Sequence, residues 1–114
     1  MANDKTLSGN TDMLILKLLE KQDMYGYQII EGLARQSNNI FELKAGTLYP
    51  LLHLLEQKQC LESYDGETVA GRARKYYRIT EDGKKYLAEK TAEWENYTVA
   101  VNNILSGGLL LEGI

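Results

Sequence analysis

A short basic segment is the part of this sequence best suited to do chemistry. Arg72, Arg74, Lys75 and Arg78 place four positive charges within one short stretch that contains no acid. The whole chain is acidic, with a formal net charge of −3. Guanidinium and ammonium groups bind phosphate through charge-assisted hydrogen bonds, so a local cluster can dock an acidic protein on a nucleic acid. The net charge argues only against general, sequence-blind binding.

The chain lacks the sets of residues that metal binding, disulfide formation or catalysis would require. His53 is the single histidine and Cys60 the single cysteine, which leaves no zinc ligand set and no internal disulfide. No nucleophile–base pair, phosphate-cradling glycine loop or carboxylate dyad is present, so we expect no enzyme, no metal and no cofactor. Cys60 is interpreted as a small apolar filler, with a redox-sensing role as the alternative. One cysteine, a polar start and no apolar run that could span a bilayer favour a cytoplasmic protein.

Three amphipathic helices are predicted in the first half of the chain. Apolar residues recur at helical spacing over residues 11–20, about 23–35 and about 45–58. Asp23 is the expected N-cap of the second helix. Pro50 is expected near the first turn of the third helix, where its missing N–H does least harm.

Short strands are predicted on either side of the third helix. Phe41 and Leu43 alternate with polar neighbours, which is enough for a short strand. After the helix, residues 60–65 and 75–79 alternate around a glycine-bounded tip at 66–71. This pattern predicts a β-hairpin whose second half carries the basic segment. Of its two adjacent tyrosines, one is expected to be buried.

A long helix is predicted after Thr80, its expected N-cap. From Leu87 onward, one set of residues follows alternating steps of four and three, the spacing of a helix that packs on another helix. The set is Leu87, Thr91, Trp94, Thr98, Val101 and Leu105. Gly107 and Gly108 are expected to end the helix, and the apolar tail at 109–114 has no partner in this interpretation.

Three helices followed by a hairpin make the order of a winged helix-turn-helix domain. In that arrangement the third helix enters the major groove of DNA and the hairpin, or wing, contacts the backbone. The expected fold class is therefore mainly α with a small β-hairpin. We expect the winged helix-turn-helix domain over 8–80, the long C-terminal helix over 81–108 and the tail over 109–114. The basic segment would lie at or just after the wing tip, where it reaches phosphates or a minor groove.

Three sequence blocks carry a family resemblance. They are YGYQI at 25–29, GTLYPLLHLLE at 46–56 and GRARKYYRIT at 71–80. In this order and spacing they closely resemble the PadR family of bacterial transcriptional regulators, over about residues 10–105. The single long C-terminal helix is similar to the compact branch of that family, which includes phenolic-acid and multidrug-responsive repressors. The family usually has a glycine at the end of the third helix, where this chain has Gln59.

The resemblance implies a homodimeric repressor on a palindromic operator of double-stranded DNA. The last helix of each subunit would be a dimerisation helix, with an interface formed by Leu87, Thr91, Trp94, Val101 and Leu105. DNA contacts are expected at the starts of the second and third helices and on the wing. The residues concerned are Tyr25, Tyr27, Lys44, Thr47, Tyr49, Pro50, His53, Arg72, Arg74 and Lys75.

The resemblance also implies a ligand site between subunits. In the multidrug branch a tryptophan on the last helix stacks planar ligands, and Trp94 falls at the matching position. An indole offers a stacking face to an aromatic or planar cationic effector. The expected effector-binding residues are Met13, Trp94, Tyr97, Thr98 and Val101. The alternative is that Trp94 is interface core alone.

Two other functions stay open at this point. One is a winged-helix protein-interaction module that binds no DNA, against which the basic wing and the GTLYP block argue. The other is a dimeric small-molecule-binding protein whose DNA binding is vestigial. Tight ligand binding without an operator would mark that second function.

Overall fold

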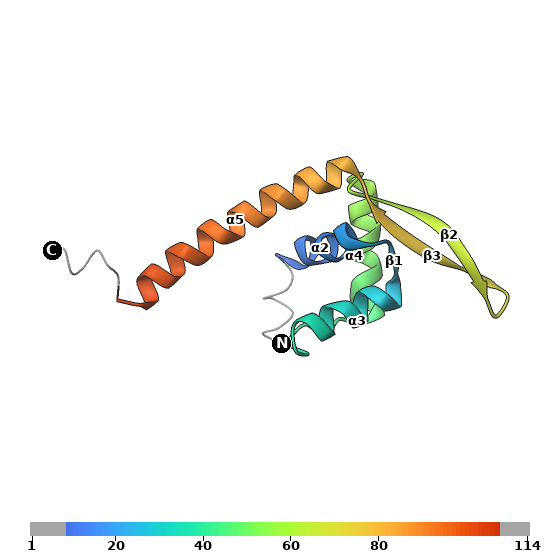
Figure 1. Ribbon diagram of the computed structural model, residues 1–114, viewed down its shortest axis with the longest axis horizontal. Helices are drawn as coiled ribbons and strands as arrows, with labels where there is room; N and C mark the ends of the chain where they lie inside the picture. Colours follow the sequence, from blue (N-terminus) through green and yellow to red (C-terminus); the bar gives the residue numbers. More distant parts are fainter. Residues whose placement is uncertain (1–8, 108–114) are drawn as a thin grey trace.

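The computed structural model describes residues 9–107, which form four helices and a small antiparallel sheet (Figure 1). In chain order the elements are α2 (Thr11–Lys21), β1 (Met24–Tyr25), α3 (Gly26–Gln36), α4 (Ala45–Gln57), β2 (Leu61–Val69), β3 (Arg72–Ile79) and α5 (Glu81–Leu105). The sheet order is β1-β3-β2, and β2 with β3 forms the hairpin. This is the winged helix-turn-helix arrangement that the sequence predicts. The predicted tail at 109–114 lies outside the described residues.

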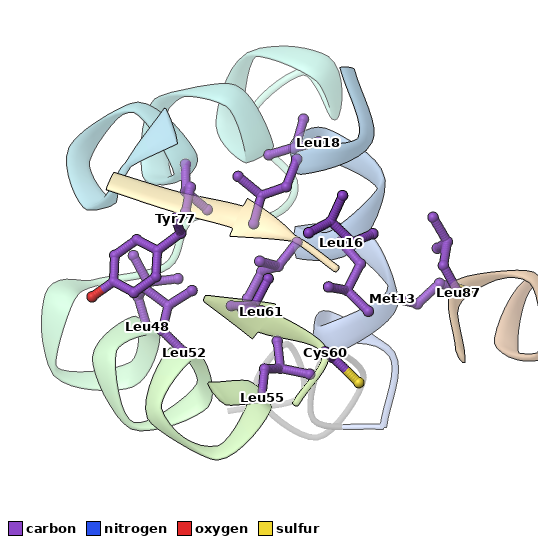
Figure 2. Packing of buried hydrophobic residues seen from close by; sticks show 14 of the residues in the cluster. Met13, Leu16, Leu18, Leu48, Leu52, Leu55, Cys60, Leu61, Tyr77 and Leu87 are labelled. Carbon is purple, nitrogen blue, oxygen red and sulfur yellow. The ribbon is translucent and has the colours of Figure 1, made fainter. Parts of the chain in front are cut away.

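One hydrophobic core joins the short helices to the root of the hairpin (Figure 2). On α4 the side chains of Leu48, Leu52 and Leu55 are almost completely buried, at steps of four and three. Each leucine buried in this way contributes about 1.5–3 kcal/mol of hydrophobic free energy. From β3, Tyr77 is buried in the same core and Tyr76 is half-buried. The prediction that one of these two tyrosines is buried is confirmed. The core therefore fixes one face of α4 and one face of the hairpin root.

The second helix begins later than predicted because a strand precedes it. Met24 and Tyr25 pair with Tyr77 and Tyr76 of β3, which holds them in extended conformation. Tyr25 therefore occupies the N-cap position of α3, and its backbone N–H donates to the Gln28 side chain at 3.1 Å. The prediction that Asp23 caps this helix is wrong. Its carboxylate instead accepts a hydrogen bond from the Tyr64 hydroxyl at 2.6 Å.

Two local predictions before and within α4 are also wrong. Residues 41–44 form no strand, although Leu43 is buried and Phe41 packs against the core. These two side chains anchor the loop between α3 and α4 on the core, and no strand of the sheet pairs with it. Pro50 lies inside α4, beyond its first turn, so this helix forgoes one internal hydrogen bond.

The wing is longer and its tip tighter than the predicted glycine-bounded loop. The strands run to Val69 and Arg72, which pair with each other. Only Ala70 and Gly71 form the turn, with φ angles of +54° and +80°. Positive φ at both central residues is the pattern of a type I′ hairpin turn, which suits the twist of the strands.

A hydrogen bond links the end of α4 to the start of α5. Gln59 has a φ of +65°, and the N–H of Cys60 donates to the Leu55 carbonyl at 2.9 Å. This is a Schellman helix ending, which usually uses glycine at the position of Gln59. Thr80 caps α5 as predicted, accepting from the Gly83 N–H at 2.9 Å, and its hydroxyl donates to the Gln59 carbonyl at 2.7 Å.

We expect Gln59→Gly to stabilise the protein by about 0.5–1 kcal/mol, because glycine adopts positive φ without the strain of a side chain. The change should appear as a higher midpoint in urea unfolding followed by circular dichroism. Gln59→Ala is the control, since alanine keeps the strained conformation. Equal stability of the glycine and alanine variants would contradict this account of the helix end.

Candidate nucleic-acid interface

Within residues 9–107, no element buries the outer face of α4. Thr47, Pro50 and His53 are exposed, as is Lys44 at the N-cap. They lie on the side of the helix away from the buried leucines, because residues at helical steps of three and four share a face. A helix with one buried and one exposed face can enter a DNA major groove without losing its place in the core.

Tyr49 lies between the exposed face of α4 and the start of α3. Its side chain is 47% exposed, and its ring sits so close to Gly26 that a Cβ atom there would collide with the Tyr49 hydroxyl. Tyr27, one residue on, is 59% exposed. The predicted DNA-contacting residues of α3 and α4 are therefore brought together. Gly26 is required for this close approach.

The four basic residues of the wing divide into two kinds. Arg72 and Lys75 are exposed, and within residues 9–107 neither forms an ion pair. Arg74, in contrast, places its guanidinium 4.3 Å from the centre of the Tyr25 ring, and its Nη1 lies 3.3 Å from Glu67 Oε2. The wing thus offers two uncommitted cations near its tip, while Arg74 already has partners inside the protein.

Arg78 repeats the pattern of Arg74 nearer the hairpin root. Its guanidinium lies 4.8 Å from the centre of the Tyr64 ring, and its Nε donates to Glu62 Oε2 at 3.2 Å. The Tyr64 hydroxyl donates to Asp23, and this hydrogen bond is the main cause that raises the pKa of Tyr64. Arg78 is thus held by two acids and a ring, since its Nη1 also lies 4.0 Å from Asp23.

Three tyrosines from the three strands form one aromatic cluster on this face of the sheet. Tyr76 stacks on Tyr64 with ring centres 5.7 Å apart and meets Tyr25 edge-on at 5.5 Å. The ring of Tyr76 also covers Gly66, where the pairing of β2 with β3 is irregular. We did not predict this cluster. The signal that could have indicated it is the hairpin register: Tyr64 and Tyr76 lie directly opposite each other, so their rings share one face of the sheet.

Comparison with known proteins agrees with this architecture. Residues 15–89 match the model of the transcriptional regulator PadR-like family. The chain belongs to the PadR-like family. It is 37% identical over 107 residues to uncharacterized protein X of Lysinibacillus sphaericus, covering 94% of this chain and 98% of that protein.

Solved structures of other family members and regulators share the fold of this PadR-like protein. A transcriptional regulator from Clostridium thermocellum is 35% identical with a TM-score of 0.81, over 87% of this chain and 96% of the other. A PadR family transcription regulator from Clostridium difficile is 37% identical with a TM-score of 0.71, over 84% and 98%. DNA-binding transcriptional regulation is the function of the family, and such regulators are generally not enzymes.

The long helix of this PadR-like regulator projects from the domain opposite the wing (Figure 1). Of the predicted interface residues, Leu87 is buried against the domain, Thr91 and Val101 are half-buried, and Trp94 and Leu105 are exposed. The predicted stripe beyond Leu87 therefore lies largely in solvent in this single chain. 

An open hollow lies beside Trp94. Its lining consists of Asn10, Lys90, Glu93, Trp94 and Tyr97, and the rings of Trp94 and Tyr97 are 5.8 Å apart. Of the five predicted effector residues, Trp94 and Tyr97 thus come together here. Met13 is buried in the core, and Thr98 and Val101 lie outside this lining.

Residues 9–107 contain neither a membrane-spanning helix nor a cluster of metal ligands. No helix there is both long and apolar enough to cross a membrane. No three or more histidine, cysteine, aspartate or glutamate side chains gather there in a way that could hold a metal ion.

We expect Gly26→Ala to displace the Tyr49 ring at a small cost in stability, because the colliding atoms are the far end of a side chain that can move. The ring signal of Tyr49, assigned by Tyr49→Phe, should shift in the NMR spectrum of protein with labelled tyrosines. Gly46→Ala is the matched control, since a Cβ there meets nothing within 4 Å. An unmoved Tyr49 signal in Gly26→Ala would contradict the described packing.

Proposed function

We propose that this PadR-like regulator is a homodimeric repressor that binds a palindromic DNA operator and is released by a small aromatic or planar effector. The observation that carries the DNA-binding part is the exposed face of α4 together with a wing that carries two cations without an ion pair, Arg72 and Lys75. Two such units in one dimer would place two α4 helices in successive major grooves, about 34–36 Å apart.

The proposed contacts divide by their chemistry. Thr47, Tyr49, Pro50 and His53 would lie in or beside the major groove, where side chains read base edges. Lys44, Arg72 and Lys75 would neutralise phosphates and so fix the register, without reading sequence. Tyr25 and Tyr27 at the start of α3 would support the phosphate side, where helix N–H groups also attract anions.

The proposed dimer rests on α5. This helix has 25 residues, which corresponds to a length of about 37 Å. Beyond Leu87 its stripe of helix-packing residues exposes large apolar side chains, Trp94 at 43% and Leu105 at 76%. Such a stripe at helix-packing spacing is best buried by the same stripe of a second copy.

The proposed effector site is the hollow beside Trp94 and Tyr97. The two rings offer stacking faces to a planar ligand, and the lining adds one acid, Glu93, and one base, Lys90. A second copy packed along α5 would close the open side. A ligand there releases DNA only if it binds the DNA-free arrangement of the dimer more tightly than the bound one.

We expect the protein to bind a fragment of its own promoter region at least about 1000-fold more tightly than a scrambled duplex. Fluorescence anisotropy of labelled DNA at two salt concentrations is the measurement. The affinity should fall steeply as salt rises, because phosphate contacts release counterions. Equal, weak binding to both duplexes would mean that the operator lies elsewhere or that the wing serves another partner. Binding sites selected from genomic fragments would separate these two outcomes.

We expect Trp94→Ala to weaken both dimerisation and effector binding. Trp94 is the single tryptophan, so its fluorescence in the unaltered protein reports a planar aromatic cation, such as proflavine, that binds beside it. In the variant, anisotropy of the dye itself replaces that signal, and sedimentation measures the dimer. Val99→Ala is the control, since Val99 is exposed but lies off the proposed stripe. Unchanged dye binding and unchanged sedimentation in Trp94→Ala would end the effector proposal.

A further inference from the structure

The contacts of Arg74 differ from those expected of a phosphate-binding residue. Its guanidinium faces the Tyr25 ring at 4.3 Å and lies 3.3 Å from the Glu67 carboxylate. The same Glu67 oxygen accepts a hydrogen bond from the Tyr76 hydroxyl at 3.0 Å. A hydrogen bond from its own backbone N–H, and then the one from Tyr76, lower the pKa of the Glu67 carboxyl, which keeps it charged beside Arg74. The positive charge of Arg74 is therefore already matched inside the protein.

The partners of Arg74 lead from the wing to the recognition helix α4. Tyr25 is the N-cap of α3, and the Tyr49 ring of α4 lies against the backbone of the next residue, Gly26. Contacts thus run from Glu67 on β2, through Arg74 on β3 and Tyr25 on β1, to Tyr49. The core also joins α4 to the hairpin, but at its root and on the opposite face, through Tyr77 and Ile79. The Ser63 hydroxyl donates to the Glu56 carboxylate of α4 at 2.6 Å. The contacts of Arg74 are a further connection, on the face away from the core and nearer the tip.

We propose that Arg74 is a positioning residue of the DNA interface, which sets the angle of the wing relative to α4 and does not itself bind phosphate. Held between the Tyr25 ring and Glu67, it keeps Arg72 and Lys75 at the distance from α4 that a groove and its flanking phosphates require. This role rests on the proposed DNA binding, and it separates two arginines that lie two residues apart and look equivalent in the sequence.

The shape of the guanidinium, and not its charge alone, is what this role needs. A lysine keeps the charge but loses the planar group that stacks on Tyr25 and pairs with Glu67. We expect Arg74→Lys to lower DNA affinity about fivefold, corresponding to the loss of one stacked cation–ring contact. Arg35→Lys is the matched control, since Arg35 is an exposed arginine at the far end of α3, outside the proposed interface, and this variant should bind DNA as the unaltered protein does. An Arg74→Lys variant that binds DNA as tightly as Arg35→Lys would overturn the proposal.

The salt dependence of binding gives a second readout that a loss of folding would not move. Arg72→Gln should lower the slope of log affinity against log salt by about 1, because one phosphate contact is lost. Once Arg72 and Lys75 are both changed to Gln, Arg74→Gln should lower neither the affinity nor the slope further, because no wing cation is left to position. A further decrease of the slope by about 1 in that background would make Arg74 an ordinary phosphate contact.

A double-mutant cycle tests the path through the ring. If Arg74 acts through Tyr25, Arg74→Lys should cost little further affinity once Tyr25→Leu is present. Additive losses would overturn that path.

Each comparison is made on the operator and on a scrambled duplex, because wing–phosphate contacts act on any sequence. If the unaltered protein fails to prefer the operator, the proposed regulator fails. The comparison of Arg74→Lys with Arg35→Lys on the scrambled duplex still decides the role of Arg74.

Discussion

The recognition helix α4 depends on burying one stripe of leucines while its opposite face stays in water. Leu48, Leu52 and Leu55 pack into a core that α2, α3 and the hairpin root also fill. Because protein interiors are close-packed, this stripe determines the rotation of α4 about its own axis. The direction in which Thr47 and Pro50 point follows from it. Both the shape of the DNA-facing surface and the place of the wing beside it rest on this packing.

Contacts at both ends of α4 link its orientation to the positions of the wing and of α5. At its start, Tyr49 lies against Gly26, and the aromatic cluster continues from there onto the wing. At its end, the Gln59 carbonyl accepts from the Thr80 hydroxyl at the cap of α5. A Cβ atom on Gly83 would collide with the Cys60 carbonyl, so the first turn of α5 lies directly on the end of α4.

The direction of α5 is further fixed by a contact with α2. The Tyr86 hydroxyl donates to the Asp12 carboxylate at 2.6 Å, which is the main cause that raises the pKa of Tyr86. In the proposed dimer, the separation of the two α4 helices would therefore follow from how the two α5 helices pack. That is the physical route by which a ligand beside Trp94 could alter operator binding.

The helices, the wing and the family were predictable, because amphipathic spacing and the three sequence blocks are local signals. The missed features depend on partners far away in the sequence. The two residues of β1 are extended only because β3 lies beside them, and Asp23 meets Tyr64 from 41 residues away. Likewise, nothing in the sequence distinguishes the roles of Arg72 and Arg74, two arginines in the same basic segment. Only the register of the sheet places Tyr25 and Glu67 against one of them.

The central claim is that DNA is bound by the outer face of α4 together with the wing tip. NMR titration of labelled protein with an operator duplex tests it most directly, by mapping which backbone amides shift. The account predicts that the shifted amides cluster at residues 44–53, excluding Pro50, and at 70–75. A second basic surface, formed by Lys17, Lys21 and Arg35 around a hollow between α2 and α3, provides the contrast. Shifts centred there, with α4 and the wing unaffected, would contradict the claim.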